Sequence, residues 1–286
     1  MRILSEAFLT ALKSGFLAGL TRLVTSDPDL SLEIRNGYIN IYFKGNSLLK
    51  LAETGSAGYK TEIHPKFIAD LDLPSRLVDE ATTARFLRQV PQLKHNIAMY
   101  GRRSLEIEYE QMIARANNFE PRNNSDYYVI DRQYAVRAGR FDLIGIFWAS
   151  DRRRHRAQTV PLSLMEVKFA LNRDTSELPE QISRYYEAVR PIAGHLAEES
   201  EAIFRQKLDR GLYRQPSDRI EAMKTLSIAR DLETFQFIII LVDYNPHSTE
   251  LNLHTLSELP FANQVRLFSS GFGMWQHNVA PLPGLA

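Results

Sequence analysis

A short apolar run with two charged residues near its end constrains the fold of this chain more than any other feature. Residues 162–170 read LSLMEVKFA, and so many bulky apolar side chains in succession predict a largely buried β-strand. Residues two apart in a strand lie on the same face, so Glu166 and Lys168 project side by side. Burying a carboxylate and an ammonium is costly unless they pair or bind a metal, and the strand therefore predicts an ionic site.

The preceding apolar segment supplies another acid. Residues 139–148 read GRFDLIGIFW and predict a second strand, whose one acid is Asp142. Two acids and a lysine on neighbouring strands can hold a hard divalent cation with a water molecule beside it. The alternative is a buried salt bridge that serves register or stability. Two acids facing one lysine leave surplus negative charge, which favours the cation.

The composition is ordinary for a folded protein and removes several classes of function. With 286 residues the chain can bury one large core or two unequal ones, and its net charge of +1 means that a polyanion must meet a local basic patch. The absence of cysteine excludes disulfides and thiolate zinc sites and fits a reducing compartment. The seven histidines show no metal-ligand spacing. No phosphate-binding loop, G-x-S-x-G or G-x-G-x-x-G motif occurs, which weighs against nucleotide hydrolysis, serine esterase chemistry and dinucleotide redox.

Hydropathy and the beginning of the chain predict a cytoplasmic protein with no membrane partner. The longest strongly apolar run, near residues 235–242, is far shorter than a membrane span. Residues 1–24 mix charged and small residues at helical spacing and lack the form of a secretory signal.

The first third of the chain predicts a small domain of helix and sheet. Alternating residues surround Asn36-Gly37, which is the strongest short signal for a hairpin. The expected elements are a helix at 5–24, a hairpin at 32–43 and a further strand at 48–51. We assign residues 1–95 to an α+β domain. Its role is either structural or dimerising, which would give a homodimer, or it binds nucleic acid or another partner.

The remainder, residues 96–286, has a different order of elements and predicts an α/β domain. The expected elements are a helix at 102–117, strands at 127–130 with 133–136, at 139–149 and at 160–170, a helix from about 176 that Pro191 interrupts, a helix at 192–210, and strands at 235–243 and 265–268. Helix, three strands, helix and strand make a compact α/β core.

This order, with one acid on the second strand and Glu-x-Lys on the third, resembles the PD-(D/E)XK nuclease superfamily over about residues 100–245. The resemblance implies a restriction-endonuclease-like core, a mixed sheet flanked by helices, with Mg²⁺ or Mn²⁺ as cofactor. It implies that Asp142 and Glu166 bind the metal, with the Val167 carbonyl as a third ligand. Lys168 would orient or help to deprotonate the attacking water and offset charge on the scissile phosphate. Phe141 replaces the proline of the family's name, a departure common in the superfamily.

Two helices that flank the predicted sheet offer further site residues. Family members often add a glutamate from the helix before the sheet, and Glu106 and Glu110 lie four residues apart beside the apolar stripe of that helix. The pattern does not separate these two, and a surface role is the alternative for both. On the helix after the motif, Gln181 and Tyr185 share a face, as polar residues over the metal do in some relatives. Their alternative roles are capping and packing.

An arginine-rich loop between the second and third strands is the candidate for substrate contact. Residues 151–156 read DRRRHR and are too charged to bury. Arg152, Arg153 and Arg154 are therefore expected to contact phosphates, unless the loop is simply solvated. Together these features predict a metal-dependent nuclease that hydrolyses phosphodiester bonds, in DNA rather than RNA. The alternatives are a nuclease fold without catalysis, which binds nucleic acid or a protein partner, and a structural component of an assembly.

Overall fold

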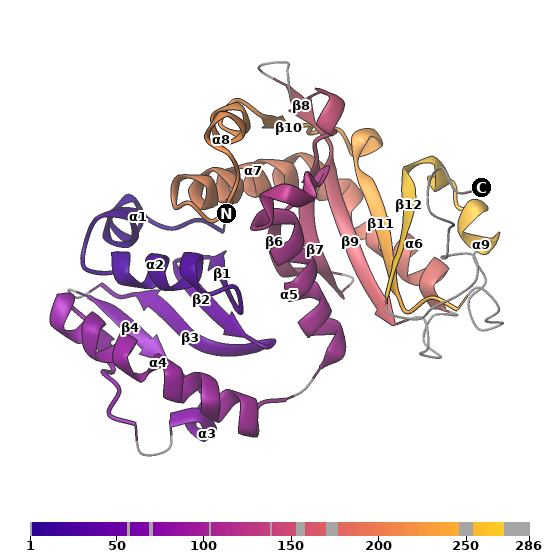
Figure 1. Ribbon diagram of the computed structural model, residues 1–286. Helices are drawn as coiled ribbons and strands as arrows, with labels where there is room; N and C mark the ends of the chain where they lie inside the picture. The colour runs from indigo at the N-terminus through magenta and orange to yellow at the C-terminus, as the bar shows by residue number, and fades with distance from the viewer. Residues whose placement is uncertain are drawn as a thin grey trace, which may run out of the picture.

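Two five-stranded sheets organise this α/β protein (Figure 1). The structure, a computed structural model, describes residues 2–55, 58–68, 71–102, 104–137, 139–152, 158–169, 177–245 and 254–271. The strand order is β1-β2-β3-β4-β5 in the first sheet and β12-β11-β9-β7-β6 in the second, and a small pair joins β8 to β10.

The first sheet belongs to the N-terminal part of the chain and is antiparallel throughout. Its first hairpin is the one that Asn36-Gly37 predicts, since Arg35 pairs with Tyr38 across the turn and Gly37 has a φ of +73°. The elements are α1 (Glu6–Lys13), α2 (Ala18–Ser26), β1 (Leu30–Arg35), β2 (Tyr38–Phe43), β3 (Asn46–Glu53), β4 (Tyr59–Glu62), α3 (Pro65–Ile68), β5 (Arg76–Leu77) and α4 (Glu80–Tyr100).

The helix expected over residues 5–24 is wrong as a single element, because the chain forms two helices, α1 and α2. Ser14 and Gly15 lie at the break, and glycine is a poor helix former. The Gly15 amide donates to the Thr10 carbonyl, one residue further back than in an α-helix, which ends α1. The apolar face survives the break, since Phe8 and Leu20 are both fully buried.

Within the described ranges, no single helix is long and apolar enough to cross a membrane, whereas α1 and α2, bent by 61°, pass that test of length and composition only when taken together.

The second sheet contains the strands that carry the predicted site. Strand β7 pairs antiparallel with β6 and with β9, whereas β11 pairs parallel with β9 and with β12, so the sheet is mixed. Its elements confirm the expected order: α5 (Leu105–Asn118), β6 (Tyr127–Val136), β7 (Gly139–Phe147), β9 (Leu162–Phe169), α6 (Leu178–Val189), α7 (Ala193–Asp209), β11 (Gln236–Val242) and β12 (Val265–Ser270). Shorter elements are β8 (Thr159–Val160), α8 (Ser217–Met223), β10 (Ser227–Ile228), α9 (His254–Ser257) and 3₁₀ turns at Pro121–Asn123, Ser150–Arg152, Arg190–Ile192, Leu232–Thr234 and Ala262–Gln264.

Helices cover both faces of the second sheet (Figure 1). Helix α5 packs on one face, where Ala114 belongs to an apolar cluster with Met165 and Val167 of β9. Helices α6 and α7 pack on the other face, where the cluster includes Leu164 of the same strand. Because side chains alternate along β9, Glu166 and Lys168 point to the α6 face.

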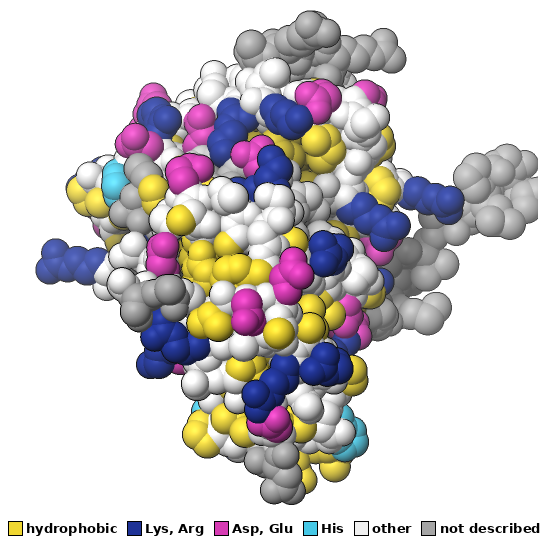
Figure 2. All heavy atoms as spheres, turned by 90° about the vertical axis from the view of Figure 1, so that its left-hand side faces the viewer, with side chains coloured by type: hydrophobic (Ala, Val, Ile, Leu, Met, Phe, Trp, Pro, Cys, Tyr) yellow, Lys and Arg dark blue, Asp and Glu magenta, His cyan; other side chains and the backbone are white. Residues whose placement is uncertain are grey.

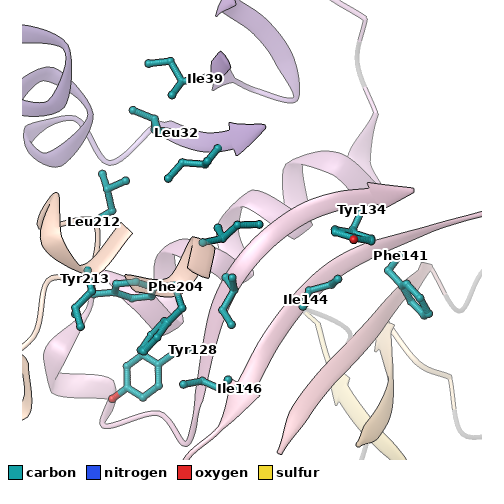
Figure 3. Close-up of a cluster of buried hydrophobic side chains, with 14 of the residues drawn as sticks. Leu32, Ile39, Tyr128, Tyr134, Phe141, Ile144, Ile146, Phe204, Leu212 and Tyr213 are labelled. Atoms are coloured by element: carbon teal, nitrogen blue, oxygen red, sulfur yellow. The ribbon is translucent and has the colours of Figure 1, made fainter. Parts of the chain in front are cut away.

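The larger apolar cluster continues from the second sheet into the first (Figure 3). Leu32 and Ile39 of the first sheet lie on one side of it, and Phe204 and Tyr213 connect them to the second sheet. Buried polar contacts accompany this core: Lys207 pairs with Glu33 at 2.6 Å, and Arg35 pairs with Asp131. The two sheets therefore share one continuous interior. Helices α1, α2, α4, α6 and α7 also contribute buried apolar side chains to it.

Candidate metal and catalytic site

Asp142 lies where strands β7 and β9 separate. The two strands pair from Ile146–Leu162 to Leu143–Met165. Asp142 is the next residue of β7 beyond this last pair, so it has no backbone partner on β9 in this register. The Val167 amide then donates to Asp142 Oδ2 at 2.9 Å, so the carboxylate takes the place of a strand partner. The amide and carbonyl of one strand residue point to the same side. The Val167 carbonyl therefore faces the same opening as Asp142.

Glu166 lies beside this opening and has one oxygen satisfied and one oxygen free. The residue is 4% exposed, and its Oε1 accepts from Lys168 Nζ at 3.0 Å and from Gln181 Nε2 at 2.6 Å. Its Oε2 is buried and has no hydrogen-bond partner. Buried acceptors are rarely left unsatisfied, so this oxygen points to a ligand such as a cation or a water molecule.

Helix α6 supplies the two residues expected from it. Besides its bond to Glu166, Gln181 Nε2 donates to Tyr185 Oη at 3.0 Å, and Tyr185 Oη donates to the Arg140 carbonyl at 3.0 Å. Gln181 and Tyr185 therefore link α6 to both strands of the site, β9 through Glu166 and β7 through Arg140. These hydrogen bonds orient the Glu166 carboxylate, which is a role beyond capping or packing.

Helix α5 approaches the site from the opposite face, and its two candidate glutamates, Glu110 and Glu106, have different surroundings. Glu110 is 1% exposed, and Gln133 Nε2 donates both to Glu110 Oε1 at 2.6 Å and to Asp142 Oδ1 at 3.3 Å. Arg132 Nη2 lies 3.5 Å from the other oxygen of Glu110. Glu106, one turn earlier, is only half-buried. Its charge adds to the burial that raises the pKa of Asp142 and to the charges of Glu166 and Asp142 that raise the pKa of Lys168.

Arg132 and Gln133 are site residues that were not expected from the sequence. Their signal was present, because the polar sequence Asp131-Arg132-Gln133 interrupts an otherwise apolar strand. Those residues are part of one continuous strand, β6, and polar residues inside a buried strand require partners. Which partners they find depends on α5 and β7, and that is tertiary information.

The acids of the site shift one another's pKa. Burial, followed by the charge of Asp142, raises the pKa of Glu110 and that of Glu166 from 4.5 to about 7 each. Burial also raises the pKa of Asp142, against the Val167 amide that lowers it. Burial disfavours the charged form of Lys168, but Glu166 outweighs this effect together with the other acids, and the lysine pKa is raised. Strongly shifted pKa values in a group of neighbouring ionisable residues are frequent at functional sites.

The arginine-rich loop leaves the sheet at the other end of β7. Arg153 and Arg154 lie outside the described residues, and only the backbone of Arg152 is described, in the turn Ser150–Arg152. Five residues of strand, about 17 Å, separate Asp142 from Phe147 at the end of β7. The start of this loop therefore lies away from the acids, and the expected phosphate contacts of Arg152, Arg153 and Arg154 fall on side chains outside the described residues. An exposed arginine near the acids is Arg140, whose charge partly opposes the burial that raises the pKa of Asp142.

The donor set is small but suits magnesium. Among the described residues, no group of three or more His, Cys, Asp or Glu side chains converges as a metal cage. Mg²⁺ keeps several waters and needs only one or two carboxylates from the protein. Asp142, Glu166 and the Val167 carbonyl meet that need, and the free Glu166 Oε2 fits a cation.

No family model, curated protein or solved structure matches this chain. The functional argument therefore starts from the geometry of the site.

Glu166→Gln is expected to remove a pH-dependent loss of stability. Because the folded-state pKa of Glu166 is about 7 and its ordinary value is 4.5, the folded protein binds more protons than the unfolded chain between these pH values. The free energy of unfolding of the wild type therefore falls as pH rises through this interval, by on the order of 3 kcal/mol from this group. Glutamine does not titrate, so the variant gains stability relative to the wild type as pH rises.

Urea unfolding in the presence of EDTA, at about pH 5 and about pH 8, measures this difference. The same difference between variant and wild type at both pH values contradicts the prediction.

Proposed function

We propose that this protein is a metal-dependent nuclease of the PD-(D/E)XK type that hydrolyses phosphodiester bonds in DNA. The observation that carries the proposal is the meeting of Asp142 with Glu166 and Lys168 where β7 and β9 separate, next to a buried carboxylate oxygen without a partner. The mixed sheet, with α5 on one face and α6 on the other, agrees with a restriction-endonuclease-like core.

Asp142, Glu166 and the Val167 carbonyl would hold Mg²⁺ or Mn²⁺. A bound divalent cation of this kind supplies water activation and polarisation of the phosphate. The chain's own residues set the geometry: the Val167 amide fixes the Asp142 carboxylate, and Gln181 fixes that of Glu166. A side chain held in one orientation needs no reorganisation when substrate binds.

Lys168 acts in this proposal as a cation. Its raised pKa keeps the ammonium protonated near neutral pH, so it offsets charge on the scissile phosphate and orients the attacking water by hydrogen bonding. A lysine in this state is a poor general base. The water proton therefore goes to a carboxylate or to solvent.

The substrate is a polyanion that must find local positive charge. Basic and acidic side chains are interspersed among the described residues on the face formed by the N-terminal part of the chain (Figure 2). Arg140 is a better candidate for a phosphate contact. It is exposed at the β6–β7 hairpin, and Gly139 lets that hairpin approach α6 closely, since a Cβ there would lie 3.0 Å from the Tyr185 ring. Arginine suits phosphate because it donates two parallel hydrogen bonds.

The second candidate is a nuclease fold that binds nucleic acid or a protein partner without catalysis. It is favoured by the absence of a three-acid cluster among the described residues and by the satisfaction of Glu166 Oε1 through Lys168. In that case Asp142, Glu166 and Lys168 serve as a buried structural group.

One experiment separates these functions. Purified protein is incubated with duplex DNA, single-stranded DNA and RNA, with Mg²⁺, Mn²⁺ or EDTA, and Mn²⁺ binding is measured by calorimetry in parallel. We expect metal-dependent cleavage of DNA and saturable Mn²⁺ binding. No heat of binding at millimolar Mn²⁺, together with intact substrates, refutes the nuclease and supports the binding protein.

A further inference from the structure

Gln133 has a backbone conformation that is unusual for a strand residue. Its φ is +56°, in the left-handed region that residues with a side chain seldom adopt, although it lies inside β6. Glycine would take this conformation at lower cost. A strained residue of this type persists only where the surrounding structure requires it, and such residues gather at functional sites.

The left-handed residue changes which face of the sheet its neighbours use. In a regular strand Arg132 and Tyr134 would point to the same side, because they are two residues apart. Arg132 instead donates to the Ile107 carbonyl of α5 at 3.1 Å, whereas Tyr134 donates to Glu199 of α7 on the opposite face. The irregular backbone at Gln133 therefore sends one side chain to each helix layer.

The side chain of Gln133 spans the distance between two acids. Its single amide nitrogen donates to Glu110 Oε1 at 2.6 Å and to Asp142 Oδ1 at 3.3 Å. An amide nitrogen carries two hydrogens, so each acid receives one. Glu110 is buried and Asp142 is partly buried, and two like charges in such surroundings repel each other unless a donor lies between them.

Arg132 completes the connection on the side of α5. Its Nη2 lies 3.5 Å from Glu110 Oε2, and its Nη1 donates to Ser31 Oγ of β1 at 2.9 Å. Glu110 is thus held from two sides, by Gln133 and Arg132. For Glu106 the structure gives no hydrogen bond or ion pair in the described part of the chain.

We propose that Gln133 is a positioning residue, which holds Glu110 of α5 beside Asp142 and so makes Glu110 the helix acid of the site in preference to Glu106. The strained backbone is retained because glycine, which would relieve it, has no amide to place between the acids. That the bridge serves a metal site rests on the proposed function. The bridge itself is a matter of geometry and is tested without metal.

The first test is a double-mutant cycle in EDTA. Gln133→Met and Glu110→Met keep side-chain length but remove the hydrogen bond, and urea unfolding gives the unfolding equilibrium constants of both single variants and the double variant. We expect the unfolding equilibrium constant of the double variant to differ by roughly fivefold or more from the value obtained by multiplying the two single effects, as for residues in contact. If the effects multiply, Gln133 does not hold Glu110, and the proposal is overturned.

The second test measures Mn²⁺ affinity by calorimetry. Gln133→Met is expected to raise the Kd by roughly tenfold, the usual effect of losing a residue that orients a metal site. Gln264→Met is the matched control, because Gln264 is also a buried glutamine, and its amide donates to the Leu232 carbonyl at 2.7 Å from the turn Ala262–Gln264, which carries none of the acids. Its Kd should stay within about twofold of the wild type.

Equal losses of affinity in the two glutamine variants overturn the positioning role. If the wild type neither binds Mn²⁺ nor cleaves DNA, the proposed function fails. The cycle in EDTA then still decides whether Gln133 holds Glu110 in place.

Discussion

Glu166→Gln is expected to reduce metal-dependent DNA cleavage by roughly a thousandfold or more, while the protein stays folded. Glutamine has the shape of glutamate and its Oε1 can still accept from Lys168 and Gln181. What is lost is the negative charge and the free oxygen, Oε2, whose place an amide nitrogen takes. An amide nitrogen repels a divalent cation. The variant therefore tests the metal role with little change in packing.

Asp142→Asn should give a loss of similar size for the same reason. The one amide oxygen of asparagine can take the place of Asp142 Oδ2 and still accept from the Val167 amide. The amide nitrogen then lies at the position of Oδ1 and faces the donor of Gln133. Some destabilisation is expected there, so circular dichroism and urea unfolding accompany the assay. Glu180→Gln, on an exposed acid of α6, is the control and should cleave like the wild type. Full cleavage by either site variant would falsify the assignment.

The elements of the second sheet were predictable because each carries a strong local signal. Strands β7, β9 and β11 are apolar runs bounded by polar residues, and β9 stands out by the pair Glu166 and Lys168 inside such a run. The site follows from pairing two such strands. Asp142 and Glu166 lie just beyond the last paired residues, where a side chain can enter between the strands.

Helix α4 shows the limit of this approach, because no expected element corresponds to it. Pro91 lies in its interior, and a proline there normally argues against a helix. The signal that defines its start is a capping box, in which Asp79 and Thr82 exchange hydrogen bonds. Burial of residues such as Phe86 and Leu93 against the first sheet stabilises this helix, whereas its local propensity does not.

The polar contacts around the acids were beyond the sequence for a different reason. Gln133 reaches Glu110 and Asp142 only because its backbone is left-handed, and no residue pattern marks a glutamine for that conformation. The α6 contact was easier to predict, since Gln181 and Tyr185 are four apart and share a helix face. Local periodicity thus predicts which side chains share a helix face, and tertiary packing decides which residues they contact.

Lys168→Met is expected to lower kcat by roughly a hundredfold or more while leaving the Mn²⁺ affinity unchanged or somewhat tighter. Methionine keeps most of the apolar stem and removes the ammonium. Lys168 now occupies Glu166 Oε1 at 3.0 Å, so its removal frees carboxylate charge for a cation. A residue that acts on water and phosphate should therefore affect turnover and not metal binding.

Lys168→Arg sharpens this test, because it keeps the positive charge but spreads it over a planar group that cannot occupy the same position. We expect Lys168→Arg to bind Mn²⁺ like the wild type and to recover only part of the lost turnover. Single-turnover cleavage with calorimetry on the same preparations measures both quantities. If kcat and Mn²⁺ affinity fall together in Lys168→Met, the lysine supports the metal site as a structural partner of Glu166, and its role in the chemical step is refuted.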